Sequence, residues 1–386
     1  MQVVVLIRTI AYLLSGFFPR SKNILIFGAW FGERFSDNPK YLLNEFLNSN
    51  KYKDYRFVWI GNVSIFPDYY DERVSFVRRN SLQSIWYQLR AKSAFVSHGF
   101  QDLGSLNLLK GAQTFQLWHG FPVKHIGADD PGNSQEGQHI YEHYQHFLAN
   151  SKVMAQRVCT AFKNYGATEN NVIIAPQPRE DYLRDNANNT ELKSRIKHQL
   201  GIKDSTTVIA YFPTFRDNTE QVFSFVENDN EMLKKTLRDN QMTILERQHY
   251  ARDNHHTNDF DRPINTPFIN LPENIEVQDV LLISDYLISD YSSIYIDFLQ
   301  LNKPIIHFLY DGDNYLKYDR GLYSNVPEYE FGGPIAYSVD DLVKLLQLPQ
   351  NQFQSQNRAL SNRLALASQP TLIQILESKD GKVRDV

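Results

Sequence analysis

The segment Tyr286–Leu309 contains the pattern that most restricts how this chain can fold. It begins with a short apolar run, Tyr286–Ser289, that has the length and residue types of a buried strand. Apolar residues then recur at helical spacing over Ile294–Leu301, and a second apolar run follows at Pro304–Leu309. Two strands joined by a helix usually pair in parallel, so the pattern predicts an α/β protein.

The polar turn of this unit, Asp290-Tyr291-Ser292-Ser293, has the features of an anion site. The free N–H groups of the following helix and the hydroxyls of Ser292 and Ser293 would point the same way. Asp297 lies one helical turn beyond Ser293 and could accept hydrogen bonds from a ribose. In the alternative interpretation, Asp290 and Ser292 only cap the helix. We assign capping to Asp290 because a carboxylate would repel a diphosphate.

The same alternation of apolar runs and helical stretches extends along most of the 386 residues, a length that predicts two domains. We expect an apolar segment at 1–20, an N-terminal Rossmann-like domain at 21–182 and a C-terminal one at 183–386. The boundary falls after a rigid polar turn, Pro176–Asp181. The other predicted strands are Asn23–Phe27, Phe57–Ile60, Val74–Phe76, Ala94–Ser97, Thr114–Leu117, Phe147–Asn150, Val172–Ala175, Thr207–Tyr211 and Met242–Glu246.

Composition narrows the class of function. A net charge of -4 argues against nucleic acid as the main partner. Cys159 is the only cysteine, which excludes a disulfide framework and a cysteine-based zinc site and fits a reducing, cytosolic setting. No carboxylate cluster has obvious metal-ligand spacing, so we predict no essential metal and no cofactor.

The stretch Gln2–Phe18 is strongly apolar and has Arg8 near its centre. It is slightly short for a bilayer span and lacks the features of a secretory signal. Basic Arg20 and Lys22 follow, and no acidic residue precedes Glu33. We therefore expect a peripheral helix on the cytoplasmic face of the membrane, bound to anionic lipid. The alternative is a helix packed on the first domain.

Two histidines follow predicted strands of the first domain. In open α/β sheets, ligands bind just outside the carboxyl ends of the strands. His119 follows the strand Thr114–Leu117 and stands between Trp118 and Gly120, which makes it a candidate general base. His98, after Ala94–Ser97, is a weaker example of the same arrangement.

Polar side chains also follow two strands of the second domain. Thr214 and Arg216 come shortly after Thr207–Tyr211. Arg247 and His249 come after Met242–Glu246 and would project to the same side of an extended segment. A cation and an imidazole on one side suit a phosphate group, although a solvated surface pair is the alternative.

Four motifs occur in an order that resembles the CDP-glycerol glycerophosphotransferase family, the teichoic acid primases and polymerases. They are WHGFPVKHIG (118–127), YFPTFRD (211–217), RQHY (247–250) and SDYSSIYIDF (289–298). The resemblance covers the chain from about Ser21 onward. It implies a GT-B architecture, in which two Rossmann-like domains with parallel sheets face each other across a cleft and the C-terminal domain binds the donor diphosphate. No large extra N-terminal domain is evident, so we expect a minimal catalytic unit.

The resemblance also suggests roles for individual residues. The motif histidines fall on His119 and His249, which we take as catalytic. The donor-binding candidates are Thr214, Arg216, Arg247, Ser292, Ser293 and Asp297. Of these, Arg247 and Asp297 are proposed from their own sequence context rather than from the resemblance. The acceptor-side candidates are Lys124 and Asn38. The turn Gln177–Asp181 lacks the glycine usual in the family, so the resemblance assigns it no role.

The implied reaction is the transfer of glycerol phosphate or ribitol phosphate from a CDP-alditol. The acceptor is a hydroxyl of a lipid-linked glycan or of a growing teichoic acid or capsular polymer, and CMP is released. His119 would remove the acceptor proton, while the donor-binding residues hold the diphosphate charge. The implied partners are the donor, the acceptor and the membrane surface. One alternative is a GT-B glycosyltransferase that uses a sugar nucleotide, and another is a scaffold with a degenerate cleft.

Overall fold

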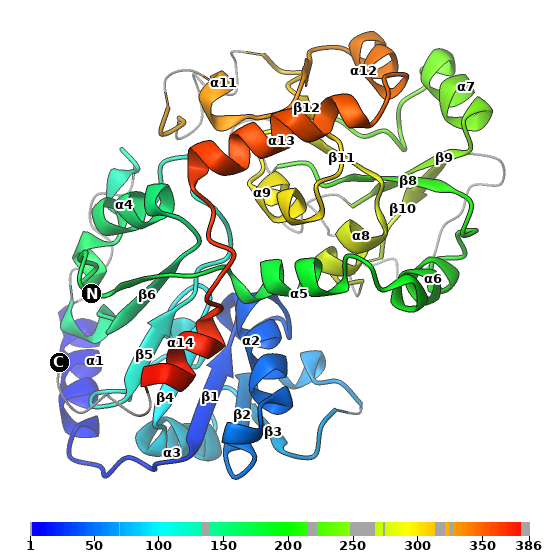
Figure 1. Cartoon of the computed structure of the whole chain (residues 1–386). Coiled ribbons are helices and arrows are strands. Elements are labelled where there is room, and N and C mark those ends of the chain that lie inside the picture. The colour runs from blue at the N-terminus through cyan, green and yellow to red at the C-terminus, as the bar shows by residue number, and fades with distance from the viewer. Residues whose placement is uncertain are drawn as a thin grey trace. The chain divides into compact units, whose positions relative to one another are not determined.

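The structure is a computed structural model that describes residues 2–68, 70–132, 139–214, 222–247, 267–272, 275–312, 321–324 and 327–379. These residues form two compact units, each built on a parallel sheet (Figure 1). Unit 1 contains the chain up to Gly120, Ile126–Asp181 and the residues from Ala365 onward, and unit 2 contains Phe121–His125 and Tyr182–Leu364. The predicted α/β class with two parallel-sheet units is confirmed.

The sheet of unit 1 has the strand order β3-β2-β1-β4-β5-β6-β7, and every neighbouring pair is parallel. The order reverses between β1 and β4, which is the position where open α/β sheets bind ligands. The strands are β1 (Ile24–Gly28), β2 (Arg56–Gly61), β3 (Val74–Arg78), β4 (Ser93–Val96), β5 (Gln113–Gln116), β6 (His146–Ala149) and β7 (Val172–Ile174).

Local sequence explains where several helices of unit 1 begin. Ser81 Oγ accepts a hydrogen bond from Ser84 N at 3.1 Å, and Ser151 Oγ accepts one from Met154 N at 3.0 Å. Each serine thereby caps a helix whose first N–H groups lack partners within the helix. The helices of this unit are α1 (Gln2–Ser15), α2 (Asp37–Asn48), α3 (Leu82–Arg90), α4 (Lys152–Ala161) and α14 (Leu372–Lys379), and α5 (Pro178–Asn186) spans the boundary between the units.

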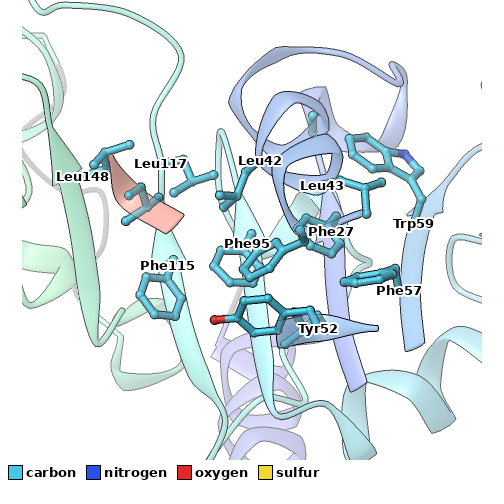
Figure 2. Close-up of a cluster of buried hydrophobic side chains, with 14 of the residues drawn as sticks. Phe27, Leu42, Leu43, Tyr52, Phe57, Trp59, Phe95, Phe115, Leu117 and Leu148 are labelled. Atoms are coloured by element: carbon cyan, nitrogen blue, oxygen red, sulfur yellow. The ribbon is translucent and has the colours of Figure 1, made fainter. Parts of the chain in front are cut away.

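A large aromatic core lies between the sheet of unit 1 and helices α2 and α14. Figure 2 shows this cluster, in which the rings of Phe27 and Phe95 on neighbouring strands stack with centroids 5.1 Å apart. Phe46 of α2 packs against both rings. Both faces of the central strands are covered, so their sequences read as continuous apolar runs rather than as alternating ones.

The C-terminal helix α14 belongs to unit 1, and Figure 1 shows it in red beside α2. Leu372 of α14 is fully buried in the aromatic core, and Lys51 donates to the carbonyl of Glu377. The sequence-based division placed 183–386 in one C-terminal domain, so this return to the first unit is a difference. Helix packing over more than 300 residues leaves no local signal in the sequence.

Helix α1 contacts unit 1 along one narrow face. Tyr12 is buried against Phe100 and Tyr141, and the Arg8 guanidinium lies 5.8 Å from the centre of the Phe100 ring. After the helix, Arg20 donates to the carbonyls of Leu108 and Lys110 at 3.1 and 2.6 Å. The remaining apolar side chains are exposed to solvent: Val3, Val4, Leu6, Ile7, Ile10, Leu13, Leu14, Phe17 and Phe18. The helix therefore packs on the first unit and also presents an apolar surface.

The sheet of unit 2 has the strand order β10-β9-β8-β11-β12-β13, again parallel throughout, with the reversal between β8 and β11. Its strands are β8 (Thr207–Tyr211), β9 (Met242–Glu246), β10 (Phe268–Asn270), β11 (Tyr286–Ser289), β12 (Ile305–Phe308) and β13 (Ile335–Ala336). Its helices are α6 (Thr190–Gln199), α7 (Glu231–Asp239), α8 (Val277–Ile283), α9 (Ile294–Phe298), α11 (Pro327–Glu330), α12 (Val339–Leu346) and α13 (Asn351–Leu364).

Several predicted boundaries differ from these. The polar turn predicted at Pro176–Asp181 is in part the start of α5, because Pro178 occupies the first helical position, where its missing N–H has no consequence. Helix α9 ends at Phe298, and a 3₁₀ turn completes the segment predicted as one helix. Strands β10 and β13 are too short to produce a pattern of their own.

Candidate functional site

The two histidines of unit 1 lie at the carboxyl ends of the neighbouring strands β4 and β5, so the structure brings them into contact. The rings of His98 and His119 stack with centroids 3.9 Å apart and planes inclined by 6°. Since β4 borders the reversal of strand order, the pair lies where the sheet topology places ligand sites. His98 is the weaker candidate in the sequence, whereas in the structure both rings lie at the same edge of the sheet.

Hydrogen bonds define which nitrogen of His119 carries the proton. His119 Nδ1 lies 3.3 Å from the carbonyl oxygen of Ser97, which can only accept a hydrogen bond. Nδ1 therefore carries the hydrogen, and Nε2 of the neutral ring has a free electron pair. His98 Nδ1 lies 2.9 Å from the Ser97 hydroxyl, which can donate or accept. The geometry thus gives His119 the form that a general base requires.

Both rings are half-buried, and burial favours their neutral forms. It lowers the pKa of His119 from 6.5 to about 4, and the nearby Asp37 carboxylate opposes this shift. Burial and the neighbouring His119 together lower the pKa of His98 to about 2. At neutral pH both imidazoles are therefore uncharged, which leaves the pair able to accept a proton.

Aromatic residues surround the pair. The ring centroid of Trp30 lies 4.4 Å from that of His98, and the ring of Trp118 lies 4.0 Å from that of His119. Phe31 lies 4.9 Å from His98 and is 49% exposed. Trp30, Phe31 and Trp118 all have positive φ, at 49°, 55° and 58°. Such conformations cost about 1–3 kcal/mol each in non-glycine residues and persist only where the surroundings impose them.

Asp102 imposes the conformation of the loops that follow β1 and β4. Its buried carboxylate accepts hydrogen bonds from the backbone N–H groups of Phe31 at 2.7 Å and of Ser97 and His98 at 2.9 Å each. Burial raises the pKa of Asp102 to about 6, although these N–H groups act in the opposite direction. Asp102 is not among the residues predicted from the sequence; the signal that could have found it is an acidic residue four positions after a histidine at a strand end.

The two acceptor-side candidates differ in their surroundings. Asn38 is fully buried, and its amide donates to the carbonyl of Trp118 at 2.8 Å. The predicted contact of Asn38 with an acceptor is therefore corrected to a role in holding the loop that carries His119. Lys124 belongs to unit 2, where its backbone pairs with Leu322, although the sequence placed it in the N-terminal domain.

In unit 2, the turns after β8 and β11 meet at the second reversal of strand order. Asp290 joins them: its carboxylate accepts hydrogen bonds from Thr214 N at 2.8 Å, from Thr214 Oγ1 at 2.6 Å and from Ser292 N at 3.2 Å. The predicted helix-capping role of Asp290 is thus wrong, because the carboxylate links two turns 76 residues apart. This link places Thr214 and Ser292 together.

The serines of this turn differ in their contacts. Ser292 Oγ accepts a hydrogen bond from Ile294 N at 3.3 Å, and Ser293 makes no side-chain capping bond. Both side chains are partly exposed. Asp297 is buried and accepts from Gln278 Nε2 at 2.9 Å, so its carboxylate is not presented for a ribose as predicted. Helix α9 has only five residues, which weakens the expected dipole contribution.

Arg247 is buried at the end of β9. Its guanidinium donates to the carbonyl of Ile275 at 2.6 Å and lies 5.3 Å from the centre of the Phe212 ring. This burial argues against the alternative of a solvated surface pair, and the phosphate contact of Arg247 stays a prediction. Arg216 and His249 lie outside the described residues. Among the residues that the structure describes, no group of three or more His, Cys, Asp or Glu side chains could hold a metal ion.

The sequence matches the family described as CDP-glycerol:poly(glycerophosphate) glycerophosphotransferase over residues 10–368. It is 27% identical to a teichoic acid poly(glycerol phosphate) polymerase of Bacillus spizizenii, covering 92% of this chain and 91% of that relative. It is 30% identical to a teichoic acid glycerol-phosphate transferase of Staphylococcus aureus, covering 85% and 84%. A solved structure of the wall teichoic acid polymerase TagF, in a histidine-to-alanine variant, is similar with a TM-score of 0.78 at 26% identity, covering 94% and 90%.

Proposed function

Because this chain belongs to the CDP-glycerol:poly(glycerophosphate) glycerophosphotransferase family, we propose that it transfers glycerol phosphate from CDP-glycerol to a hydroxyl acceptor and releases CMP. The acceptor is a growing teichoic acid chain or a lipid-linked glycan. The observation that carries the proposal is the neutral His119, whose Nδ1 faces the Ser97 carbonyl and whose Nε2 keeps its electron pair.

His119 acts as the general base. The acceptor oxygen attacks the phosphorus atom that bears glycerol, and the acceptor proton passes to Nε2 of His119. The bond between that phosphorus and the oxygen bridging to CMP breaks, and the electron pair leaves with CMP. Proton transfer of this kind contributes about 10²–10⁴ in rate. Stacking on His98 keeps the ring of His119 in one orientation throughout this step.

The turns of unit 2 bind the donor. The hydroxyls of Ser292 and Ser293 lie at the carboxyl end of β11, where a diphosphate can accept hydrogen bonds. Thr214, after the adjacent strand β8, supports this turn through its bonds to Asp290. Arg216 and His249, which follow β8 and β9 in the sequence, add positive charge and a second imidazole. Phosphoryl-type transfer depends mainly on such positioning and charge stabilisation.

A donor panel tests this function. Purified full-length protein is incubated with CDP-glycerol, CDP-ribitol or UDP-sugars and a synthetic lipid-linked acceptor, and the released nucleotide is measured. CMP from CDP-glycerol is the expected result. Release of CMP from CDP-ribitol alone would show that the donor carries ribitol instead of glycerol. Release of UDP from a UDP-sugar would show that the protein is a glycosyltransferase and would overturn the proposal. A parallel reaction with EDTA tests the prediction that no metal is required. A loss of CMP release that added Mg²⁺ restores would contradict that prediction.

We also propose that α1 holds the enzyme on the membrane where its acceptor lies. No helix among the described residues is long and apolar enough to span a bilayer. The exposed side chains of α1 nevertheless form an apolar surface, with Leu6 58% and Leu14 55% exposed. Basic Arg8 lies in the helix, and Arg20 and Lys22 follow it. An apolar helix face with basic neighbours suits the interface of an anionic bilayer.

A further inference from the structure

The turn at Gln177–Asp181, to which the sequence assigns no role, places one arginine against the His119 loop. Arg179 lies in the first turn of α5 and is 8% exposed. Its Nη1 donates to Asp37 Oδ1 at 3.0 Å and to the carbonyl oxygen of His119 at 2.8 Å. One guanidinium nitrogen therefore joins the start of α2 to the backbone of the proposed base.

A second set of bonds holds the preceding residue. Asn38 donates to the carbonyl of Trp118 at 2.8 Å, and Asn38 Oδ1 accepts from the backbone N–H of Arg179 at 3.3 Å. Asp37 Oδ2 accepts from Trp30 Nε1 at 3.1 Å, so the aromatic residue beside His98 is attached to the same network. Two successive carbonyls of the loop, at positions 118 and 119, thus accept hydrogen bonds from the side chains of Asn38 and Arg179, and Asp37 in turn binds Arg179.

The network fixes a backbone that would otherwise relax. Trp118 has a φ of 58° and Asp37 a φ of 65°, conformations that side-chain-bearing residues rarely adopt. Without the bonds to its carbonyl groups, the loop is expected to return to ordinary φ values. The His119 ring would then turn away from the Ser97 carbonyl, and Nε2 would no longer point toward the acceptor hydroxyl.

We propose that Arg179 and Asp37 are a positioning pair that holds the Trp118–His119 loop, with Trp118 in its left-handed conformation, and so aims His119 Nε2 at the acceptor hydroxyl. The inference rests on the proposed function, in which His119 is the base. Arg179 is too buried to bind the polymer, and its Nη1 donates to two acceptors at once. The rigid guanidinium fixes this nitrogen in place, whereas the flexible stem of lysine does not. The charged and titratable groups that face His119 are Asp37, Arg179 and His98.

The test compares Arg179→Gln, Arg179→Lys and Asp37→Asn with a control, Arg78→Gln, whose side chain is exposed at the end of β3. A displacement of about 1 Å in a catalytic group can cost 10²-fold, so kcat should fall about 10- to 100-fold in all three variants. The Kd of CDP-glycerol, measured by calorimetry, should stay within twofold because the donor turns lie in unit 2. Arg78→Gln should match the wild type.

The pH profile separates positioning from a general structural role. Arg179 lowers the pKa of His119 and Asp37 raises it. The acid limb of kcat/KM should therefore move to higher pH in Arg179→Gln and to lower pH in Asp37→Asn. A general structural defect would not shift the acid limb of kcat/KM in opposite directions in the two variants. An unchanged acid limb in variants with native circular dichroism would overturn the proposal. A kcat within twofold of the wild-type value would also overturn it.

Titration of the histidine side chains by NMR gives a readout that does not need turnover. Opposite shifts of the His119 titration in the two charge variants support the pair even if the wild-type protein releases no CMP. In that case the proposed function fails and the positional role stands. Identical His119 titrations in the wild type, Arg179→Gln and Asp37→Asn would overturn the pair independently of activity. In Arg179→Lys, which keeps the charge, an unchanged tautomer signal of His119 would show that the planar group is not needed.

Discussion

His98 and His119 stack face to face, with ring planes inclined by only 6°, although 20 residues separate them in the chain. The contact exists because β4 and β5 are neighbours in the sheet and end at the same edge. The neighbouring His119 contributes to the lowered pKa of His98, because two adjacent charged rings would repel each other. Burial lowers the pKa of His119, so its ring stays neutral over a wide range of pH, as the proposed base requires.

Replacing His119 by alanine should reduce the transfer rate by about 10²–10⁴, because the acceptor proton then has no side-chain base. The Kd of CDP-glycerol should change little, since the donor turn lies in the other unit. Rates of CMP release and calorimetric binding of the donor are the two measurements. Turnover near the wild-type value would refute the role of His119.

Activity should persist to lower pH than an ordinary histidine base allows. Burial lowers the pKa of His119 to about 4, so the ring remains neutral as the pH falls from 7 to about 5. The acid limb of kcat/KM should lie near pH 4 rather than 6.5, with circular dichroism used to exclude unfolding. A limb close to 6.5 would show that the ring is hydrated as in a free histidine.

The same lowered pKa values of His98 and His119 affect stability. The unfolded chain, with ordinary histidines, binds more protons than the folded chain below pH 6.5, so the free energy of unfolding should decrease as the pH falls from 6.5 toward 4. Asp102 acts in the opposite sense, because its raised pKa lets the folded state bind a proton first. Urea unfolding across this range should show a shallower decrease in the wild type than in Asp102→Asn.

The serine hydroxyls can be separated by single substitutions. Ser293→Ala should weaken CDP-glycerol binding by roughly 1.5–3 kcal/mol with little change in thermal stability, since Ser293 makes no capping bond. Ser292→Ala should affect both properties because its hydroxyl also accepts from Ile294 N. Ser338→Ala, which removes the cap of α12, is the control that changes stability alone. Unchanged donor affinity in Ser293→Ala would leave the turn without a binding role.

Membrane binding can be tested without truncating α1, whose buried Tyr12 contributes to packing. Leu6→Ser together with Leu14→Ser removes two exposed apolar side chains and should weaken binding to anionic vesicles by about tenfold or more, at roughly 1.5–3 kcal/mol per fully buried leucine. Met232→Ser, at an exposed position on α7, should have no effect. Equal sedimentation of both variants with vesicles would exclude α1 as the attachment site.

Much of the architecture could be read from the sequence. Strands β8, β9 and β11 have the predicted bounds, because an apolar run of four or five residues, bounded by turn-forming residues, can be buried on both faces only as a central strand. The location of His119 at the end of β5 follows from another apolar run of this kind, Thr114–Leu117. Ser81, Ser151 and Asn230 cap the starts of α3, α4 and α7 for an equally local reason, although the predictions from the sequence did not use these signals.

Only the tertiary structure decided the order of the strands and the partners of the buried polar groups. Whether β4 lies beside β1, or α14 beside α2, depends on which surfaces pack together across hundreds of residues. Asp37 and Arg179 are 142 residues apart, and Asp290 and Thr214 are 76 apart. A buried charge or amide is stable only with its partner, and that partner is chosen by the packed fold rather than by neighbouring residues in the chain. For this reason the sequence predicted His119 as a base, and the structure shows which side chains bind its loop.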